Sequence, residues 1–241
     1  FWCVCMEILI RFPKYFGGIM INFAGHCFEK DFILLNLRWY AAYKLSYRNL
    51  VEMATERGVS IAHTTIMRWV LKFSTEIDKA ARKLKKPTGN RYFLDETYIK
   101  VKGVWKYLYR AVDEAGQTVD YLLTSKRDKK AAARFFKKAI GSNPQPEKVY
   151  IDKSGANKAG IEDVQRNLEN PITVDQSKYM NNRIEQDHRQ IKQLYRATLG
   201  FKGFWSAWQT LRLFEVWQMF KKNQIEAGAK TPVGNFYALF S

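Results

Sequence analysis

The chain has little cysteine, no long apolar run and few acidic residues, and each shortage excludes a class of protein. Its three cysteines all lie within the first 27 residues, and an odd, clustered set at this spacing makes neither a disulfide framework nor a zinc site. No apolar stretch reaches the ~18 residues that a membrane span requires. Against 40 Lys and Arg stand 23 Asp and Glu, giving a net charge of +17. We therefore expect a cytoplasmic, nucleoid-associated protein with no membrane contact and a polyanionic partner.

The stretch YFLDETYIK, residues 92–100, combines strand character with a carboxylate at its centre. β-branched and aromatic residues favour a strand, and Pro87 and Gly89 mark its start. A carboxylate in a buried strand requires a cation, a metal or a catalytic role to compensate its charge, whereas an edge strand would leave Asp95 solvated. Glu96 follows directly, but side chains alternate along a strand and point it to the other face of the sheet. We therefore do not count Glu96 as a ligand.

Three helical patterns precede this strand. Apolar residues recur at intervals of three and four over 29–42, 47–57 and 64–73, with Ser46 suited to an N-cap and Gly58 to a C-cap. A helix, a short glycine-containing turn and a second helix with exposed polar residues are typical of a helix-turn-helix that enters a DNA groove, although such helices also occur in proteins that do not bind DNA. The residues that would meet DNA are His63, Thr64, Thr65, Arg68 and Lys72.

After the Asp95 strand, the pattern predicts an α/β arrangement. Strands over 92–100, 104–112 and 118–124, joined by tight turns, predict an antiparallel meander. A helix over 131–140 then leads to a short strand that ends in Asp152. A strand entered from a helix should lie parallel in the same sheet, and its C-terminal end is where open α/β sheets place their sites.

A later helical stretch, 181–194, carries Glu185, His188, Arg189 and Lys192 on one face, because they are spaced three, four and seven residues apart. One interpretation is an exposed, salt-bridged helix. The other is a metal ligand, Glu185, beside cations that hold phosphates, Arg189 among them.

Asp95, Asp152 and Glu185 together suggest a metal site. Two divalent ions held about 4 Å apart by shared carboxylates activate a water or a sugar hydroxyl and stabilise the leaving oxygen. Hard oxygen ligands suit Mg²⁺, with Mn²⁺ as a substitute. The chemistry predicted is in-line phosphoryl transfer on a nucleic-acid backbone.

Several motifs resemble transposases of small bacterial and archaeal insertion sequences, the insertion-sequence-six family of the DDE superfamily. They are LRWY, LSYRNL and HTTIMRWV in the helical part, followed by DETYIKVKG, KYLYRAVD, KRDKKAA, DKS, NNRIEQDH and LGFK. The resemblance covers about residues 23–222. It implies an RNase H-like catalytic domain, a mixed sheet with flanking helices, preceded by an all-α helix-turn-helix domain.

The resemblance also implies functional residues. The catalytic triad would be Asp95, Asp152 and Glu185, holding two Mg²⁺ ions, and the basic residue seven positions past the glutamate would be Lys192. One departure is the spacing, because 32 residues separate Asp152 from Glu185 where the family usually has 34.

The function implied is that of a transposase that binds double-stranded DNA as a homodimer or higher oligomer. It would bind the terminal inverted repeats of its element, cut the 3′ ends and join them to target DNA, giving a cointegrate. Two alternatives are a DNA-binding regulator with a degenerate catalytic domain and a metal-dependent nuclease without strand transfer.

The domain organisation that we predict has five parts. An N-terminal extension without function spans 1–20, a helix-turn-helix domain 21–76, a basic linker 77–91, a catalytic domain 92–222 and a poorly structured tail 223–241. An aromatic stripe over 204–220 predicts a helix packed against the catalytic sheet.

Overall fold

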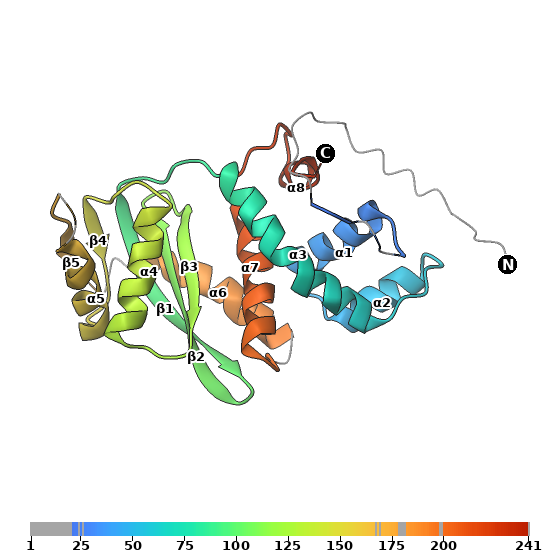
Figure 1. Cartoon of the computed structure of the whole chain (residues 1–241), viewed down its shortest axis with the longest axis horizontal. Coiled ribbons are helices and arrows are strands. Elements are labelled where there is room, and N and C mark those ends of the chain that lie inside the picture. The colour runs from blue at the N-terminus through green and yellow to red at the C-terminus, as the bar shows by residue number, and fades with distance from the viewer. Residues whose placement is uncertain are drawn as a thin grey trace.

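The computed structural model describes residues 21–240 apart from residues 24, 26, 167, 169, 178–181, 198 and 199, so the predicted N-terminal extension lies outside the described residues. Helices and strands follow one another as drawn in Figure 1. The helices are α1 (Lys30–Tyr43), α2 (Tyr47–Thr55), α3 (His63–Lys83), α4 (Lys129–Gly141), α5 (Gly155–Gln165), α6 (Asn182–Ala197), α7 (Phe204–Lys221) and α8 (Pro232–Ala238). The strands are β1 (Arg91–Val101), β2 (Val104–Asp113), β3 (Thr118–Thr124), β4 (Lys148–Tyr150) and β5 (Thr173–Asp175). Within this part of the chain, no helix has the length and apolarity to cross a bilayer.

The sheet has the strand order β3-β2-β1-β4-β5. Strands β1, β2 and β3 form the antiparallel meander that the sequence predicts, and β4 runs parallel to β1. The turn from β1 to β2 is tight because Lys102 and Gly103 both adopt positive φ, 49° and 78°, the combination that matches the twist of a two-residue hairpin. The mixed sheet is thus confirmed, and β1 lies at its centre.

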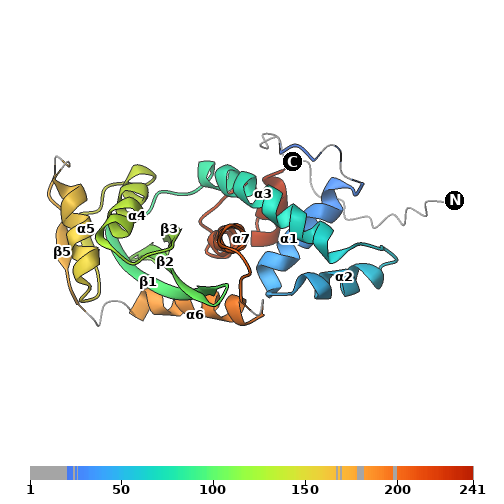
Figure 2. The same cartoon turned by 60° about the horizontal axis from the view of Figure 1, so that its bottom comes forward.

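Helices cover both faces of the sheet. Helices α4 and α5 lie on one face, and α6 and α7 lie on the other (Figure 2). On the first face, Tyr92 and Leu94 of β1 pack with Phe135, Phe136 and Ile161. Gly160 allows α5 to approach α4 closely, since a Cβ at this position would lie 2.6 Å from the Cβ of Ala132.

The N-terminal helices share one apolar core with the sheet. Helix α2 begins as predicted, because the Ser46 side chain accepts a hydrogen bond from the Asn49 backbone N–H. Helix α3, however, does not end near residue 73 but continues to Lys83, with Ile77 and Ala81 buried against α7. The apolar period therefore runs on through the stretch predicted as a basic linker. Lys79 and Lys83 are exposed there, whereas Asp78 is buried and pairs with Arg82.

The C-terminal residues are also more ordered than predicted. Residues 232–238 form α8, and Phe236, Leu239 and Phe240 are buried in the same core as α7. The ring of Phe236 packs edge-on against Trp217 and Phe220 of α7, with centroids 6.1 and 5.8 Å apart. The prediction of a poorly structured tail over 223–241 is thus wrong for the described residues.

Candidate active site

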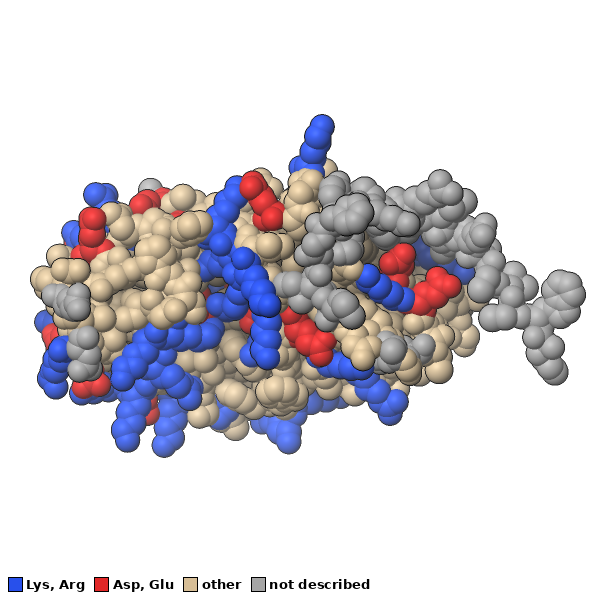
Figure 3. All heavy atoms as spheres, turned by 45° about the horizontal axis from the view of Figure 1, so that its top comes forward, with Lys and Arg blue, Asp and Glu red and all other residues tan. Residues whose placement is uncertain are grey.

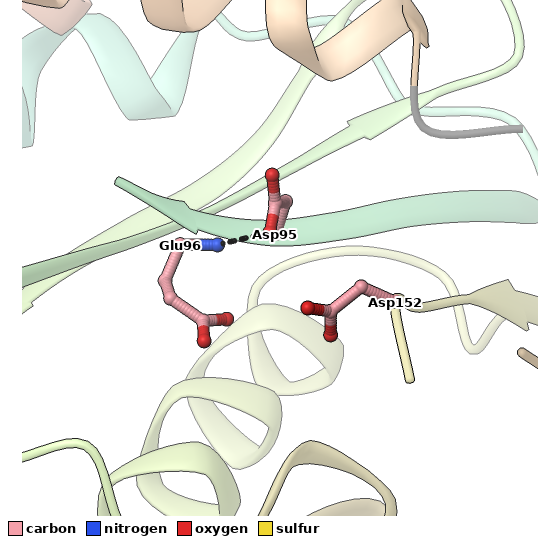
Figure 4. A group of neighbouring side chains, drawn as sticks. All are labelled: Asp95, Glu96 and Asp152. Atoms are coloured by element: carbon pink, nitrogen blue, oxygen red, sulfur yellow. Dashed lines mark hydrogen bonds between the residues drawn. The ribbon is translucent and has the colours of Figure 1, made fainter. Parts of the chain in front are cut away.

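The acidic site forms where β4 ends beside β1. The last pair in the β1–β4 register is Phe93 with Tyr150, so β1 continues beyond the end of β4 and Asp152 follows in that space. Carboxylate oxygens of Asp95, Glu96 and Asp152 lie within 4.8 Å of one another. We call these three residues the acidic cluster (Figure 4).

Glu96 belongs to the acidic cluster, although the sequence pattern did not place it among the ligands. Strand alternation does place Asp95 and Glu96 on opposite sides of β1, as Figure 4 shows. Because the pairing with β4 stops at Phe93, side chains from both faces reach around the free edge toward Asp152. Strand alternation correctly predicts that Asp95 and Glu96 lie on opposite faces of β1, but it does not prevent both carboxylates from approaching Asp152.

Arg127 is the cation of the acidic cluster. It lies between β3 and α4, forms an ion pair with Glu96 through its Nε, and places its Nη2 3.6 Å from Asp152 Oδ2. The Asn157 side chain of α5 donates a 2.8 Å hydrogen bond to Glu96 Oε2. Arg127 lies within the KRDKKAA motif, but its role could not be predicted from that motif, since the residues that it contacts are distant in the chain.

Burial makes Asp95 difficult to ionise. Its side chain is 20% exposed, and burial raises its pKa from 3.8 to about 7, with the charges of Glu96 and Asp152 acting in the same direction. The Glu96 backbone N–H donates a 2.8 Å hydrogen bond to Asp95 Oδ1, which opposes this shift. A bound cation would lower the pKa of Asp95 again, because its positive charge stabilises the ionised carboxylate.

Helix α6 brings His188 to Asp95. The His188 Nδ1 lies 3.5 Å from Asp95 Oδ2. Burial, together with the charges of Arg110 and Lys192, lowers the pKa of His188 to about 3, so its imidazole is neutral. The side chains of Glu185, Arg189 and Lys192 are exposed.

The structure places two residues of the predicted triad together and the third apart from them. It brings Asp95 and Asp152 together, while Glu185, in the first turn of α6, is exposed and lies outside the acidic cluster among the described side chains. Helix α6 still packs against β1, so Glu185 lies one helical turn from the histidine that contacts Asp95.

A buried ion network holds α6 and α7 to the sheet. Arg110 lies opposite Asp95 in the β1–β2 register. Its Nε and Nη2 donate to the two carboxylate oxygens of Glu215 at 2.6 and 3.0 Å, and Arg110 and Glu215 are 1% and 0% exposed. Arg110 Nη2 also donates to Asp187 of α6 at 3.3 Å, and Lys222 donates to the same oxygen at 2.5 Å. Sequence reasoning missed this network because its partners are distant in the chain, Arg110 and Glu215 being 105 positions apart.

The acidic cluster has the donor chemistry of a divalent metal site. All its donors are carboxylate oxygens, which hard cations such as Mg²⁺ prefer. Asp152 Oδ1 is buried and has no hydrogen-bond partner, as expected for an oxygen that awaits a ligand. Asp95 and Asp152, with Glu96, therefore fit such an ion.

The predicted DNA-contacting residues lie at the start of α3. His63, Arg68 and Lys72 are exposed, while Thr64 and Thr65 are half-buried. On the opposite side of α3, Ile66, Trp69 and Val70 are buried in the core. The exposed side chains thus lie on a helix whose orientation is held by packing.

Comparisons with known proteins identify the family. A family model described as a DDE domain matches residues 89–224. The transposase for insertion sequence-like element IS431mec of Staphylococcus aureus is 38% identical over 199 residues, covering 82% of this chain and 88% of that protein. The transposase for insertion sequence element IS257 in transposon Tn4003, also from Staphylococcus aureus, matches with the same identity and coverage.

Solved structures give more distant similarities. The catalytic core domain of BIV integrase is 18% identical with a TM-score of 0.43, and the match covers 61% of this chain and 93% of that one. The catalytic core domain of HTLV-2 integrase in complex with magnesium is 15% identical with a TM-score of 0.44, over 62% of this chain and 97% of that one. The family model and the sequence relatives establish that the chain belongs to the DDE transposases of the insertion-sequence-six family.

Proposed function

We propose that this transposase binds the terminal inverted repeats of its element and catalyses metal-dependent 3′-end cleavage and strand transfer into target DNA. The observation that carries the proposal is the acidic cluster, in which carboxylate oxygens from β1 and from the end of β4 lie within 4.8 Å. Like charges at this distance repel unless a cation lies between them. A transposase site that binds divalent metal accounts for the arrangement.

The metal would be held by Asp95 and Asp152, with a third carboxylate completing the site. Two Mg²⁺ ions, when bound there, would activate the attacking oxygen and stabilise the leaving oxygen. The chain's own residues prepare this site. Arg127 compensates Glu96 and Asp152, and the neutral imidazole of His188 lies beside Asp95 without competing for it as a cation.

The third carboxylate is Glu185 in our proposal, and Glu96 is its competitor. Glu185 is exposed, whereas Glu96 already accepts from Asn157 and pairs with Arg127. Closure of the first turn of α6 on DNA would bring Glu185 toward Asp95. A strand-transfer assay with labelled element ends and Mg²⁺ distinguishes these two assignments when it compares the Glu185→Gln and Glu96→Gln variants. We expect Glu185→Gln to abolish joining and Glu96→Gln to retain a measurable fraction; the reverse order would assign the role to Glu96.

Lys192 would contact phosphate beside the metal site. Seven residues advance a helix by almost two turns, so Lys192 shares a face with Glu185, and both are exposed. We expect Lys192→Ala to lower strand transfer more than it lowers Mg²⁺ affinity. Normal joining by a folded Lys192→Ala protein would leave the lysine as a surface charge only.

The N-terminal helices would recognise the element ends as a helix-turn-helix. Support comes from the exposed His63, Arg68 and Lys72 at the start of α3 and from the net charge of +17. Figure 3 shows the larger groups of Lys and Arg side chains at the left and in the middle of one face, and scattered ones toward the right, where α1 and α2 lie. Arg68→Ala should weaken binding to the ends by roughly 1–3 kcal/mol if it reads a base, or weaken binding to all DNA alike if it meets phosphate. Unchanged binding to every DNA would remove Arg68 from the interface.

A regulator with a degenerate catalytic domain is the second candidate, and the position of Glu185 outside the acidic cluster favours it. Asp152→Asn separates the two functions. If the chain is an active transposase, this variant binds the ends normally and neither cuts nor joins them, while the parent does both. If the parent also binds the ends yet cuts nothing with Mg²⁺ or Mn²⁺, the regulator is correct. A parent that cuts the ends but never joins them would instead be a nuclease.

A further inference from the structure

The hairpin between β1 and β2 carries large aromatic side chains in solvent. Tyr98 and Trp105 are 49% and 51% exposed, and their rings meet edge-on with centroids 6.3 Å apart. Tyr107 extends the group, 5.3 Å from Tyr98. Because Tyr98 pairs directly with Tyr107 across the hairpin, and Lys100 with Trp105, all four side chains lie on one face. We call Tyr98, Trp105 and Tyr107 the hairpin aromatics.

The charge around these rings is positive. The Lys100 Nζ lies 5.3 Å from the centre of the Trp105 ring, and Lys100 and Lys102 are both exposed. Exposed aromatic rings interleaved with lysines are the composition of surfaces that bind single-stranded nucleic acid, where bases stack on rings and cations follow the backbone. A second copy of the chain would bring the same positive charges to this surface, which disfavours self-association there.

The hairpin aromatics adjoin the acidic cluster through one side chain. Arg127 donates from Nη1 to the Tyr98 hydroxyl at 3.1 Å, while its other nitrogens contact Glu96 and Asp152. Tyr98 lies two positions after Glu96 along β1, on the same face of the strand. A nucleotide stacked on these rings would therefore lie beside the carboxylates.

We propose that the hairpin aromatics form a stacking site for unpaired DNA bases next to the acidic cluster, with Trp105 as the main platform. The proposal rests on the proposed function, because it places the site on a DNA-processing surface. A base inside a duplex hides both faces in the stack, so exposed rings gain little from paired DNA. An unpaired base offers a free face, and stacking on Trp105 would hold its strand in place.

Binding without chemistry tests the proposal. Fluorescence anisotropy of the full chain, without divalent metal, measures affinity for an oligodeoxythymidine of about 20 nucleotides and for a duplex of the same length. We expect Trp105→Ala to weaken binding of the unpaired strand by about 5- to 100-fold, the range for loss of one stacked base, and to change duplex affinity by less than about twofold. Trp105→Phe should retain most of the affinity because its ring still stacks. The matched control is Trp205→Ala, an exposed tryptophan (61%) in the first turn of α7, which should change neither affinity.

Three outcomes would overturn the proposal. These are an unchanged affinity of Trp105→Ala for the unpaired strand, an equal loss on both DNAs, and a change of oligomeric state by sedimentation with unaltered DNA binding. The last outcome would assign the surface to a second copy of the chain. If the parent cuts and joins element ends while any of these holds, the stacking site fails and the transposase function stands.

Discussion

Replacing Asp95 by Asn should make the metal-free protein more stable at alkaline pH and almost unchanged at acidic pH. Asp95 has a pKa near 7 in the folded chain, against 3.8 ordinarily. Between these values the folded state keeps a proton that the unfolded chain has lost, so the free energy of unfolding falls as pH rises from about 4 to about 7. Above pH 7 the folded protein carries the full cost of ionising a buried carboxyl, and Asn removes that cost. Below about pH 4 the carboxyl is neutral in both the folded and the unfolded chain, and Asn resembles it.

The magnitude follows from the size of the shift. About three pKa units correspond to roughly 4 kcal/mol as an upper bound, since each unit is about 1.4 kcal/mol. The stabilisation should be smaller than this bound, because the variant loses hydrogen bonds of the carboxylate and the protein relaxes around the amide. We expect the free energy of unfolding to rise by about 1–3 kcal/mol at pH 8. For a chain of this length that gain raises the melting temperature by about 3–10 °C.

Thermal melts of parent and Asp95→Asn at pH 4 and pH 8, with and without Mg²⁺, measure the effect. Mg²⁺ should raise the melting temperature of the parent, because binding to the folded state alone stabilises it, and should do so less for the variant. The control is Asp163→Asn, an exposed carboxylate of α5 paired with Lys129, which should bring no gain at either pH. A variant that is equally stable to the parent at pH 8, or stabilised equally at both pH values, would refute the assignment of Asp95 as a buried, metal-requiring carboxylate.

Three further predictions concern the packing around the site. Glu215→Gln should lower the free energy of unfolding by about 3 kcal/mol in urea melts, because it leaves the buried Arg110 without its full counter-charge. The control Glu226→Gln removes an exposed ion pair and should cost less than about 0.5 kcal/mol. Equal costs for the two variants would contradict a stabilising role of the buried network. Gly160→Ala should cost about 1–3 kcal/mol in the same assay by overpacking the contact with α4, while Gly141→Ala, with nothing within 4 Å of the added carbon, should be tolerated. Arg127→Gln should lower stability without metal and enlarge the rise in melting temperature with Mg²⁺, because the carboxylates lose their cation; an unchanged response to Mg²⁺ would show that Arg127 does not compensate them.

Much of the fold could be predicted from local patterns. Ser46 caps α2, the Lys102–Gly103 turn makes the hairpin, and the strand that ends before Asp152 lies parallel to β1. These features depend on residues close together in the chain, whose propensities act over a few positions.

The features that sequence reasoning missed depend on distant residues. Arg110 and Glu215 are 105 positions apart, and neither segment indicates that its charge has a buried partner. The position of Glu96 depends on where β4 stops pairing, a length that the apolar pattern does not define. The continuation of α3 to Lys83 was hidden because a run of charge on one face resembles a solvated linker.

The continuous core between α3, α7 and the sheet has a mechanical consequence. Helix α3 has 21 residues and begins with the side chains proposed to touch DNA, which makes it about 30 Å long. Its C-terminal half is buried against α7, and the Arg110–Glu215 pair attaches α7 to β2, the strand beside β1. Helix α3 would therefore hold its DNA-facing end at a fixed distance from the sheet, as a flexible linker would not. The distance from a recognised base to a phosphate cut by the same subunit would be set by helix length, and element ends would be trimmed at a constant offset.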